Sequence, residues 1–524
     1  MKKLICLLLA VALLAACSAP AEETAPTEDD KLRLEIGGTE ESFEPWEQAG
    51  LPTEGSFYLT QDVVLETQLR VEGSLKLHLN GHSITGLDSV IYGNMIMVAP
   101  GGEMLLCDSE GGQGRLVSPF SYGAKTTVGS MVAVAGSFTL AGGTVDASAI
   151  SLEDKANGAG FLVLEGGQLN VSGGTVIGGT TWCSALTPPP PEAPAAGENP
   201  ETTEPTEATE ATEPVDIADL VDQQPFEILG KGGSVYVAPG GTCNLSDGEI
   251  RDGSGGLGGN VYVDEGGLLM VSGGSITAGE SVFHGGNVYV AGTLEMSAGE
   301  ITLGGSYSNG GNLFVSGKLE MTGGLIAEGT CDVNSMNGKR GGNLCVNGEE
   351  AVIHISNATI RDGSANGGEG FGGNISVIGE CAREFSVSDT TISGGIGHRG
   401  GNLYFGTLSK SVNPENLDFY MRNVTVSNGV YTYRGGNLCM DSDLRGVYVN
   451  LVMDDSKFLM EENARETISL GAGAAVDTWA TLTMNGGSIE GGSLNLYADA
   501  VLTANGTAMT MDNNIGQGEL VVNP

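Results

Sequence analysis

One phrase, Gly-Gly-Asn followed by an alternating apolar run, recurs along the C-terminal half of the chain and restricts the possible folds more than any other feature. Successive copies lie 25 to 35 residues apart. Their asparagines are Asn260, Asn287, Asn312, Asn343, Asn374, Asn402 and Asn437. Short β-patterned runs that end at Gly, with no helical period between them, cannot bury their apolar side chains alone. The repeat therefore predicts an all-β solenoid in which successive units stack.

Each unit carries two or three short strands broken at Gly, so each unit is expected to form one coil. Stacking places equivalent strands in parallel register about 4.8 Å apart, with alternate Val, Leu, Ile and Met side chains in a continuous core. The expected fold is a single parallel β-helix of about fifteen coils. In this arrangement the repeated asparagines are expected to form a hydrogen-bonded ladder.

The N-terminal half follows the same pattern less strictly. The phrase Leu-Asn-Gly-His-Ser-Ile-Thr-Gly at residues 79–86, followed by turns rich in Gly-Gly, resembles the opening of right-handed β-helix repeat proteins of bacterial cell surfaces, which have the pectin-lyase-like architecture. The resemblance covers most of residues 56–524 and implies a right-handed β-helix. Its motifs specify a fold and not an activity.

Residues 1–16 combine two lysines with an apolar run that is too short for a permanent membrane span, which is typical of an export signal. The following Leu14-Ala15-Ala16-Cys17 resembles the lipobox of bacterial lipoproteins. This resemblance implies cleavage before Cys17 and acylation of its thiol, which would anchor the protein by lipid to the cell membrane, outside the cytoplasm and facing outward. The alternative is a plain secretory signal with an incidental cysteine. Residues 17–33 are expected to form a polar tether.

The rest of the chain divides into a cap, two sets of coils and an insert. Residues 34–60, with Phe43, Trp46 and Phe57, are expected to cap the first coil, and residues 61–183 and 231–524 to form the coils. Residues 184–230 are rich in Pro, Thr and Glu and are expected to be disordered. This segment is either a domain linker or a loop extruded from one coil. The matching pairs Gly166-Gly167 and Gly240-Gly241 favour the loop, with one helix continuing on both sides.

The charge balance excludes nucleic acid as a partner, because 65 acidic against 23 basic residues give a net charge of -42 that repels phosphate. No Cys-x-x-Cys spacing occurs, so neither a zinc site nor a disulfide framework is favoured. No metal or cofactor is predicted, although so acidic a surface leaves room for adventitious calcium. The cysteines beyond the lipobox are expected to be small buried hydrophobic residues: Cys107, Cys183, Cys243, Cys331, Cys345, Cys381 and Cys439.

A catalytic site is a weaker prediction. β-Helical enzymes that cleave polysaccharides cluster carboxylates on neighbouring coils, and Asp454-Asp455 is the only Asp-Asp pair beyond the tether. The flanking motifs of the hydrolase pattern do not accompany it. The alternative is that Asp454 and Asp455 are solvated turn residues.

An aromatic column is the best candidate for ligand binding. Alternation in the repeated phrase turns the residue between two inward-facing apolar residues outward. In five coils this residue is Tyr236, Tyr262, Tyr289, Phe314 or Tyr404. Exposed rings in register could stack on the faces of sugars. Alternatively, the rings stack only on one another or lie under the residues between Thr181 and Lys231.

These features together predict a lipid-anchored, non-catalytic adhesion or scaffold module that contacts glycans or cell-surface proteins. One alternative is a polysaccharide lyase or glycoside hydrolase with an unidentified acidic site. A second alternative is a passive spacer of the cell envelope.

Overall fold

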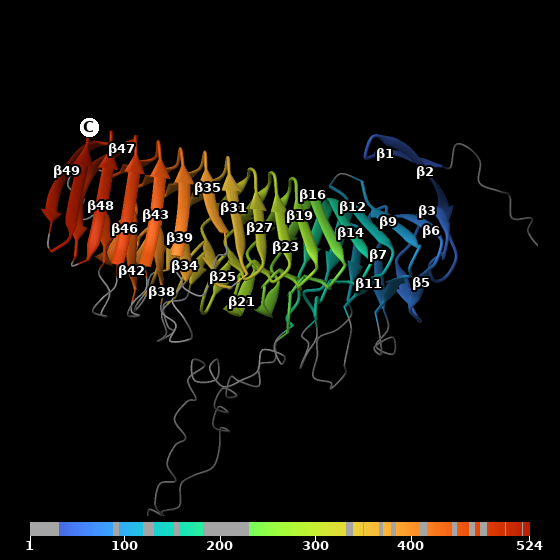
Figure 1. Cartoon of the computed structure of the whole chain (residues 1–524). Helices are drawn as coiled ribbons and strands as arrows, with labels where there is room; N and C mark the ends of the chain where they lie inside the picture. The colour runs from blue at the N-terminus through green and yellow to red at the C-terminus, as the bar shows by residue number, and fades with distance from the viewer. Residues whose placement is uncertain are drawn as a thin grey trace, which may run out of the picture.

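In a computed structural model the chain forms one long rod of stacked parallel strands (Figure 1). The structure describes residues 31–86, 94–109, 111–118, 130–150, 157–181, 230–331, 339–348, 350–365, 370–378, 384–407, 417–442, 448–460, 467–471, 479–497, 499–515 and 517–524. The export segment, Cys17, the tether as far as residue 30, Cys183, Cys381 and residues 182–229 of the insert lie outside these residues. The predicted all-β parallel solenoid is confirmed.

The first face of the rod contains the alternating run that follows each Gly-Gly-Asn phrase. Within the described residues it has fifteen strands, each paired in parallel with the next, which agrees with the expected number of coils. They are β5 (Leu69–Val71), β8 (Ile96–Val98), β11 (Val132–Val134), β13 (Phe161–Val163), β15 (Val235–Val237), β18 (Val261–Val263), β22 (Val288–Val290), β26 (Leu313–Val315), β30 (Leu344–Val346), β34 (Ile375–Ile378), β38 (Leu403–Thr407), β42 (Leu438–Ser442), β45 (Ile468–Leu470) and the second halves of β47 (Ser488–Leu496) and β49 (Ala508–Ile515).

The second face lies next along the coil and runs the length of the rod. Its strands are β2 (Thr39–Trp46), β3 (Gly55–Leu59), β6 (Ser74–His78), β9 (Glu103–Cys107), β12 (Ser137–Asp146), β14 (Gln168–Ile177), β16 (Thr242–Arg251), β19 (Leu268–Val271), β23 (Thr293–Met296), β27 (Lys318–Met321), β31 (Val352–Ser356), β35 (Glu384–Ser388), β39 (Leu417–Arg422), β43 (Tyr448–Asp454), β46 (Trp479–Asn485), β48 (Ala500–Asn505) and β50 (Glu519–Asn523).

The third face follows a corner at which β12, β14 and β16 bend, so that their second halves belong to it. The first halves of β47 and β49 also belong to this face. Its other strands are β4 (Val63–Leu65), β7 (Ser83–Gly86), β10 (Arg115–Val117), β20 (Ser275–Thr277), β24 (Glu300–Thr302), β28 (Leu325–Ala327), β32 (Thr359–Arg361), β36 (Thr391–Ser393), β40 (Thr425–Ser427) and β44 (Lys457–Leu459).

In the middle coils a fourth, shorter sheet lies between the third face of one coil and the first face of the next coil. The sequence analysis did not predict this sheet. It consists of seven parallel strands. They are β17 (Ser254–Leu257), β21 (Glu280–His284), β25 (Gly305–Ser306), β29 (Thr330–Cys331), β33 (Ser364–Ala365), β37 (Ile396–Arg399) and β41 (Val430–Arg434).

The solenoid continues across the insert as one helix. Phe161 of β13 pairs with Val235 of β15, and Gln168 of β14 pairs with Thr242 of β16. The amide of Gly166 donates to the carbonyl of Gly240 at 3.0 Å. The prediction of one continuous β-helix is therefore confirmed, and the domain-linker alternative is wrong.

The N-terminal end of the rod carries a hairpin. Strand β1 (Leu32–Ile36) is antiparallel to the first part of β2, whose last residues pair in parallel with β3. Phe43 is fully buried, and the rings of Trp46 and Phe57 meet edge to face with centroids 4.9 Å apart. The hairpin stands beside the blue end of the rod in Figure 1.

The interior is a single apolar column that extends from Leu59 to Leu502. Alternation places one residue in two of each strand inside it, as in β23, where Leu294 and Met296 are buried and Glu295 is exposed. In the described part of the chain no helix is long and apolar enough to cross a membrane.

Candidate functional site

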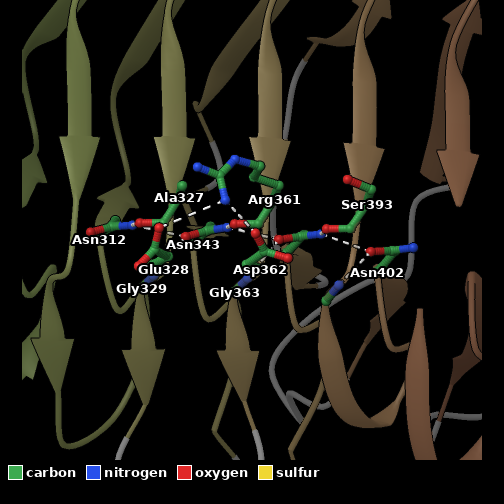
Figure 2. A network of polar contacts seen from close by, with 12 residues as sticks. Asn312, Ala327, Glu328, Gly329, Asn343, Arg361, Asp362, Gly363, Ser393 and Asn402 are labelled. Atoms are coloured by element: carbon green, nitrogen blue, oxygen red, sulfur yellow. Dashed lines mark hydrogen bonds and ion pairs between the residues drawn. The ribbon is translucent and has the colours of Figure 1, made fainter. Parts of the chain in front are cut away.

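The seven repeated asparagines form a continuous ladder along one corner of the rod, as predicted. The Nδ2 of each of the first six donates to the Oδ1 of the asparagine one coil further on, at 2.7 or 2.8 Å. All seven side chains are fully buried. Figure 2 shows part of the ladder between the third face and the fourth sheet.

Each rung also binds the main chain of its corner, which can be followed at Asn343. Its Oδ1 accepts from the amide of Gly329 at 2.9 Å, and its Nδ2 donates to the carbonyl of Arg361 at 2.7 Å (Figure 2). Together with the contacts to Asn312 and Asn374, this gives the side chain two donated and two accepted hydrogen bonds. A Cβ at Gly329 would lie 2.2 Å from the carbonyl oxygen of Gly342 and 2.7 Å from the Nδ2 of Asn312, so the corner beside the ladder requires glycine there. The ladder is a structural element whose polar atoms are engaged.

The aromatic column forms in the predicted register but is not exposed, and this corrects the sequence-based expectation. Pairing places the five rings on the outer side of the first face. However, Tyr236, Tyr262, Phe314 and Tyr404 are buried, with at most 8% of each residue exposed, and Tyr289 is half-buried. A glycan therefore has no access to the face of these rings.

The fourth sheet is the physical reason for this burial. Leu257 of β17 and both Val282 and Phe283 of β21 pack on Tyr236 and Tyr262 in a second apolar cluster. The rings also stack on one another, with centroids 5.7 Å apart between Tyr236 and Tyr262 and 5.0 Å apart between Tyr262 and Tyr289. Burial raises the pKa of the Tyr262 hydroxyl well above its usual range. The rings stack on one another, as in the alternative to sugar binding, and the fourth sheet covers them as well.

A row of basic residues, which the sequence analysis missed, lies beside the aromatic column. In several coils a basic residue directly precedes the Gly-Gly pair, and main-chain bridges hold these positions in register. The ammonium group of Lys231 lies 4.5 Å from the ring centroid of Tyr262. The imidazole of His284 stacks on Phe314 at 4.5 Å, and the guanidinium of Arg399 lies 5.3 Å from the ring centroid of Phe371. The sequence feature that could have revealed this row is the basic residue immediately before the repeated phrase.

Tyr404 belongs to a separate buried polar cluster. Its hydroxyl donates to Oδ1 of Asp441 at 2.6 Å, and Nη1 of Arg399 donates to Oδ2 of the same carboxylate at 3.0 Å. Asp441 is 1% exposed, so the carboxylate depends on these partners for its solvation. Burial and the neighbouring carboxylate raise the pKa of Tyr404. The cluster joins the first face to the fourth sheet near β37.

Replacing Tyr262 with leucine tests the structural role of the column. Leucine keeps an apolar side chain but loses the stacking on both neighbouring rings, so the free energy of unfolding is expected to fall by about 1 to 2 kcal/mol. Denaturant titration of Tyr262→Leu and Tyr307→Leu checks this, because Tyr307 is 47% exposed. Equal effects of the two changes would contradict a buried, stacked column.

The two candidate catalytic aspartates occupy structural positions. Oδ1 of Asp454 accepts from Asn485 and Oδ2 accepts from the hydroxyl of Tyr420, both at 2.7 Å. These hydrogen bonds lower the pKa of Asp454, whereas a general acid needs a raised one. Asp455 is exposed in a turn with φ of +50°. Asp455 is thus the turn residue of the alternative, and Asp454 belongs to a second polar ladder.

The described cysteine side chains lie at other positions along the rod. The cysteines that the structure describes, Cys107, Cys243, Cys331, Cys345 and Cys439, are buried and are not disulfide-bonded, as predicted for them. Burial raises the pKa of Cys243 to about 12, so its thiol stays protonated. Among the described residues no group of three or more His, Cys, Asp or Glu side chains is arranged to hold a metal ion.

The chain matches no protein-family model, no curated protein and no solved structure.

Proposed function

We propose that the protein is a lipid-anchored lipoprotein of the bacterial cell surface whose β-helix acts as a rigid adhesive scaffold. The observation that carries the proposal is the continuity of the rod. One apolar column joins its coils on both sides of a long insert, and one buried asparagine ladder joins the coils from Asn260 to Asn437. A stack of this kind holds its outer faces at a fixed distance from its N-terminal end.

The anchor follows from the resemblance of residues 14–17 to a lipobox. Two acyl chains on one residue give stable membrane attachment, whereas a single chain binds reversibly. The acidic residues between Cys17 and the first strand support the proposal, since a charged polar tether extends away from the membrane.

Replacing Cys17 with alanine is expected to move most of the protein from the membrane fraction to the culture medium, because the thiol that accepts the lipid is lost. Immunoblotting of both fractions measures the shift. Cys6→Ala is the matched control: Cys6 lies inside the export segment, so this change should leave the protein on the membrane. Continued membrane retention of Cys17→Ala would contradict the anchor.

Adhesion is tested by allowing cells that display the protein to settle on surfaces coated with polysaccharides or mucin, with and without calcium. We expect retention above that of cells expressing Cys17→Ala, without new reducing or unsaturated ends in the coating. Release of such ends would instead indicate a carbohydrate-active enzyme. Equal retention of both strains on every coating would favour the spacer. The buried aromatic column predicts that any binding uses the outer faces of the rod and not Tyr236 or Tyr262.

A further inference from the structure

A groove of about 600 Å³ lies between the N-terminal hairpin and the ridge at which the second face of the rod turns into the third. One wall is the end of β1 and its turn, Leu34–Gly37. The opposite wall comes from three successive coils and includes Asp108, Ala141–Thr144 and Thr175. The groove is therefore bounded by segments far apart in the sequence.

The hairpin wall is the edge of a strand. Four consecutive residues, Leu34–Gly37, line the groove, although side chains in a strand point alternately to opposite faces. A groove that meets both sets of side chains must run along the strand's edge. Among the strands that the structure describes, β1 pairs with β2 alone. The main chain of β1 is thus presented to the groove as an edge that a further strand can extend.

The opposite wall consists largely of main chain as well. Gly142 and Gly143 lie in the middle of the segment Ala141–Thr144, and the pairing of β12 with β14 shifts register there. Without large side chains, this wall leaves room beside β1 for an extended backbone.

The negative charge of the groove determines which ligands it attracts. Glu35 and Asp108 line it, and none of the described lining residues is a lysine or arginine. The carboxylate of Asp108 is held in place by the amides of Gly81, Ser109 and Gly114, at 3.2, 2.9 and 2.7 Å. The chain as a whole carries a net charge of -42. A ligand that enters is attracted if it is basic and repelled if it is acidic.

We propose that this groove binds a basic, extended polypeptide segment of a partner protein, which adds to the edge of β1 as a further strand. Main-chain hydrogen bonds to β1 supply affinity, and lysine or arginine side chains of the segment face Glu35 and the acidic surface around it.

The test uses the purified full-length protein in detergent and a fluorescein-labelled peptide of alternating lysine and valine, at physiological ionic strength. Fluorescence anisotropy is expected to give a Kd of about 100 µM or lower. Two further probes separate the contributions. An N-methylated copy of the peptide cannot donate main-chain hydrogen bonds along one edge, and a copy with glutamate in place of lysine reverses the charge. Both are expected to bind at least about tenfold more weakly.

Two variants locate the binding. Thr175→Trp fills the groove and should weaken binding at least about tenfold, whereas Thr391→Trp, on the same register column of the third face but far along the rod, should not. Hydrogen exchange of the wild-type protein keeps the test independent of whether Thr175→Trp folds. The bound peptide should slow exchange of the amides of residues 34–37.

Slowed exchange in this segment, together with loss of binding by the N-methylated peptide, supports the proposal. Equal binding of the N-methylated peptide would show adsorption to the acidic surface and overturn it. Unchanged exchange at residues 34–37, or a Kd weaker than about 1 mM, would also overturn it.

Discussion

Replacing Asn343 with alanine is expected to lower the free energy of unfolding by about 4 kcal/mol or more, because four polar groups in or beside the buried ladder each lose one hydrogen bond, at a cost of about 1 to 3 kcal/mol each. These groups are the amide of Gly329, the Nδ2 of Asn312, the carbonyl of Arg361 and the Oδ1 of Asn374. The side chains of Asn312, Asn343 and Asn374 are fully buried, so bulk water does not replace the lost hydrogen bonds between them. Denaturant titration measures the loss.

Asn523→Ala is the matched control for this change. The Nδ2 of Asn523 donates to the Oδ1 of Asn505 at 2.8 Å in an exposed ladder on the second face. Water can replace the lost partner there, so a cost below about 1 kcal/mol is expected. Equal losses of unfolding free energy in the two alanine variants would show that burial does not increase the contribution of Asn343 to stability.

Acidification is expected to destabilise the protein through His284, whose pKa is lowered from the usual 6.5 to about 4 mainly by burial, with Arg340 acting in the same direction. The folded state therefore takes up the proton at lower pH than the unfolded chain does. The contribution is fully present above pH 6.5 and is lost as the pH falls toward 4. The difference between the two pKa values corresponds to about 3 kcal/mol.

His284→Asn isolates this contribution from that of the many carboxylates. Asn309 occupies the same register position one coil further on, so asparagine fits the site. Between pH 7 and pH 4 the wild type should lose about 3 kcal/mol more than His284→Asn. Parallel stability curves for the two proteins would contradict a histidine that is buried in its neutral form.

His354 provides a control of opposite sign. Burial acts to lower its pKa, but the carboxylates of Glu320 and Glu384, at 2.9 and 3.1 Å, outweigh burial and raise it. Its contribution is present at low pH and is lost as the pH rises through the raised pKa. His354→Asn should therefore change the pH dependence in the direction opposite to His284→Asn.

The sequence was sufficient for the features that repeat and insufficient for those that do not. Asn260 and Asn287 recur in one phrase, so stacking alone predicts that their amides meet. Alternation also predicted correctly that Tyr262 points out of the main core. Its burial could not be predicted, because the strands that cover it, β17 and β21, are short and show no alternation of buried and exposed residues.

Asp454 and the groove beside β1 show a second limit. The ladder of Asp454 with Asn485 depends on pairing between residues 31 positions apart, and the coil of Asn485 lacks the repeated phrase. The groove depends on where a hairpin outside the repeat lies against the rod. Neither relation has a periodic signal, so only the three-dimensional arrangement reveals it.

Because the helix keeps its register across the insert, the two points at which the insert leaves and rejoins the rod are neighbours in space. Thr181 donates its amide to Ser254 while Gly230 accepts from Gly256, and a Cβ on Gly230 would overlap the carbonyl of Thr181. The pairing of the coils on either side therefore does not depend on the sequence that connects these two points. Doubling the length of an attached loop costs only about 0.6 kcal/mol of closure entropy. The junction between Thr181 and Gly230 is therefore a permissive position, where one inserted sequence can be exchanged for another without altering the β-helix.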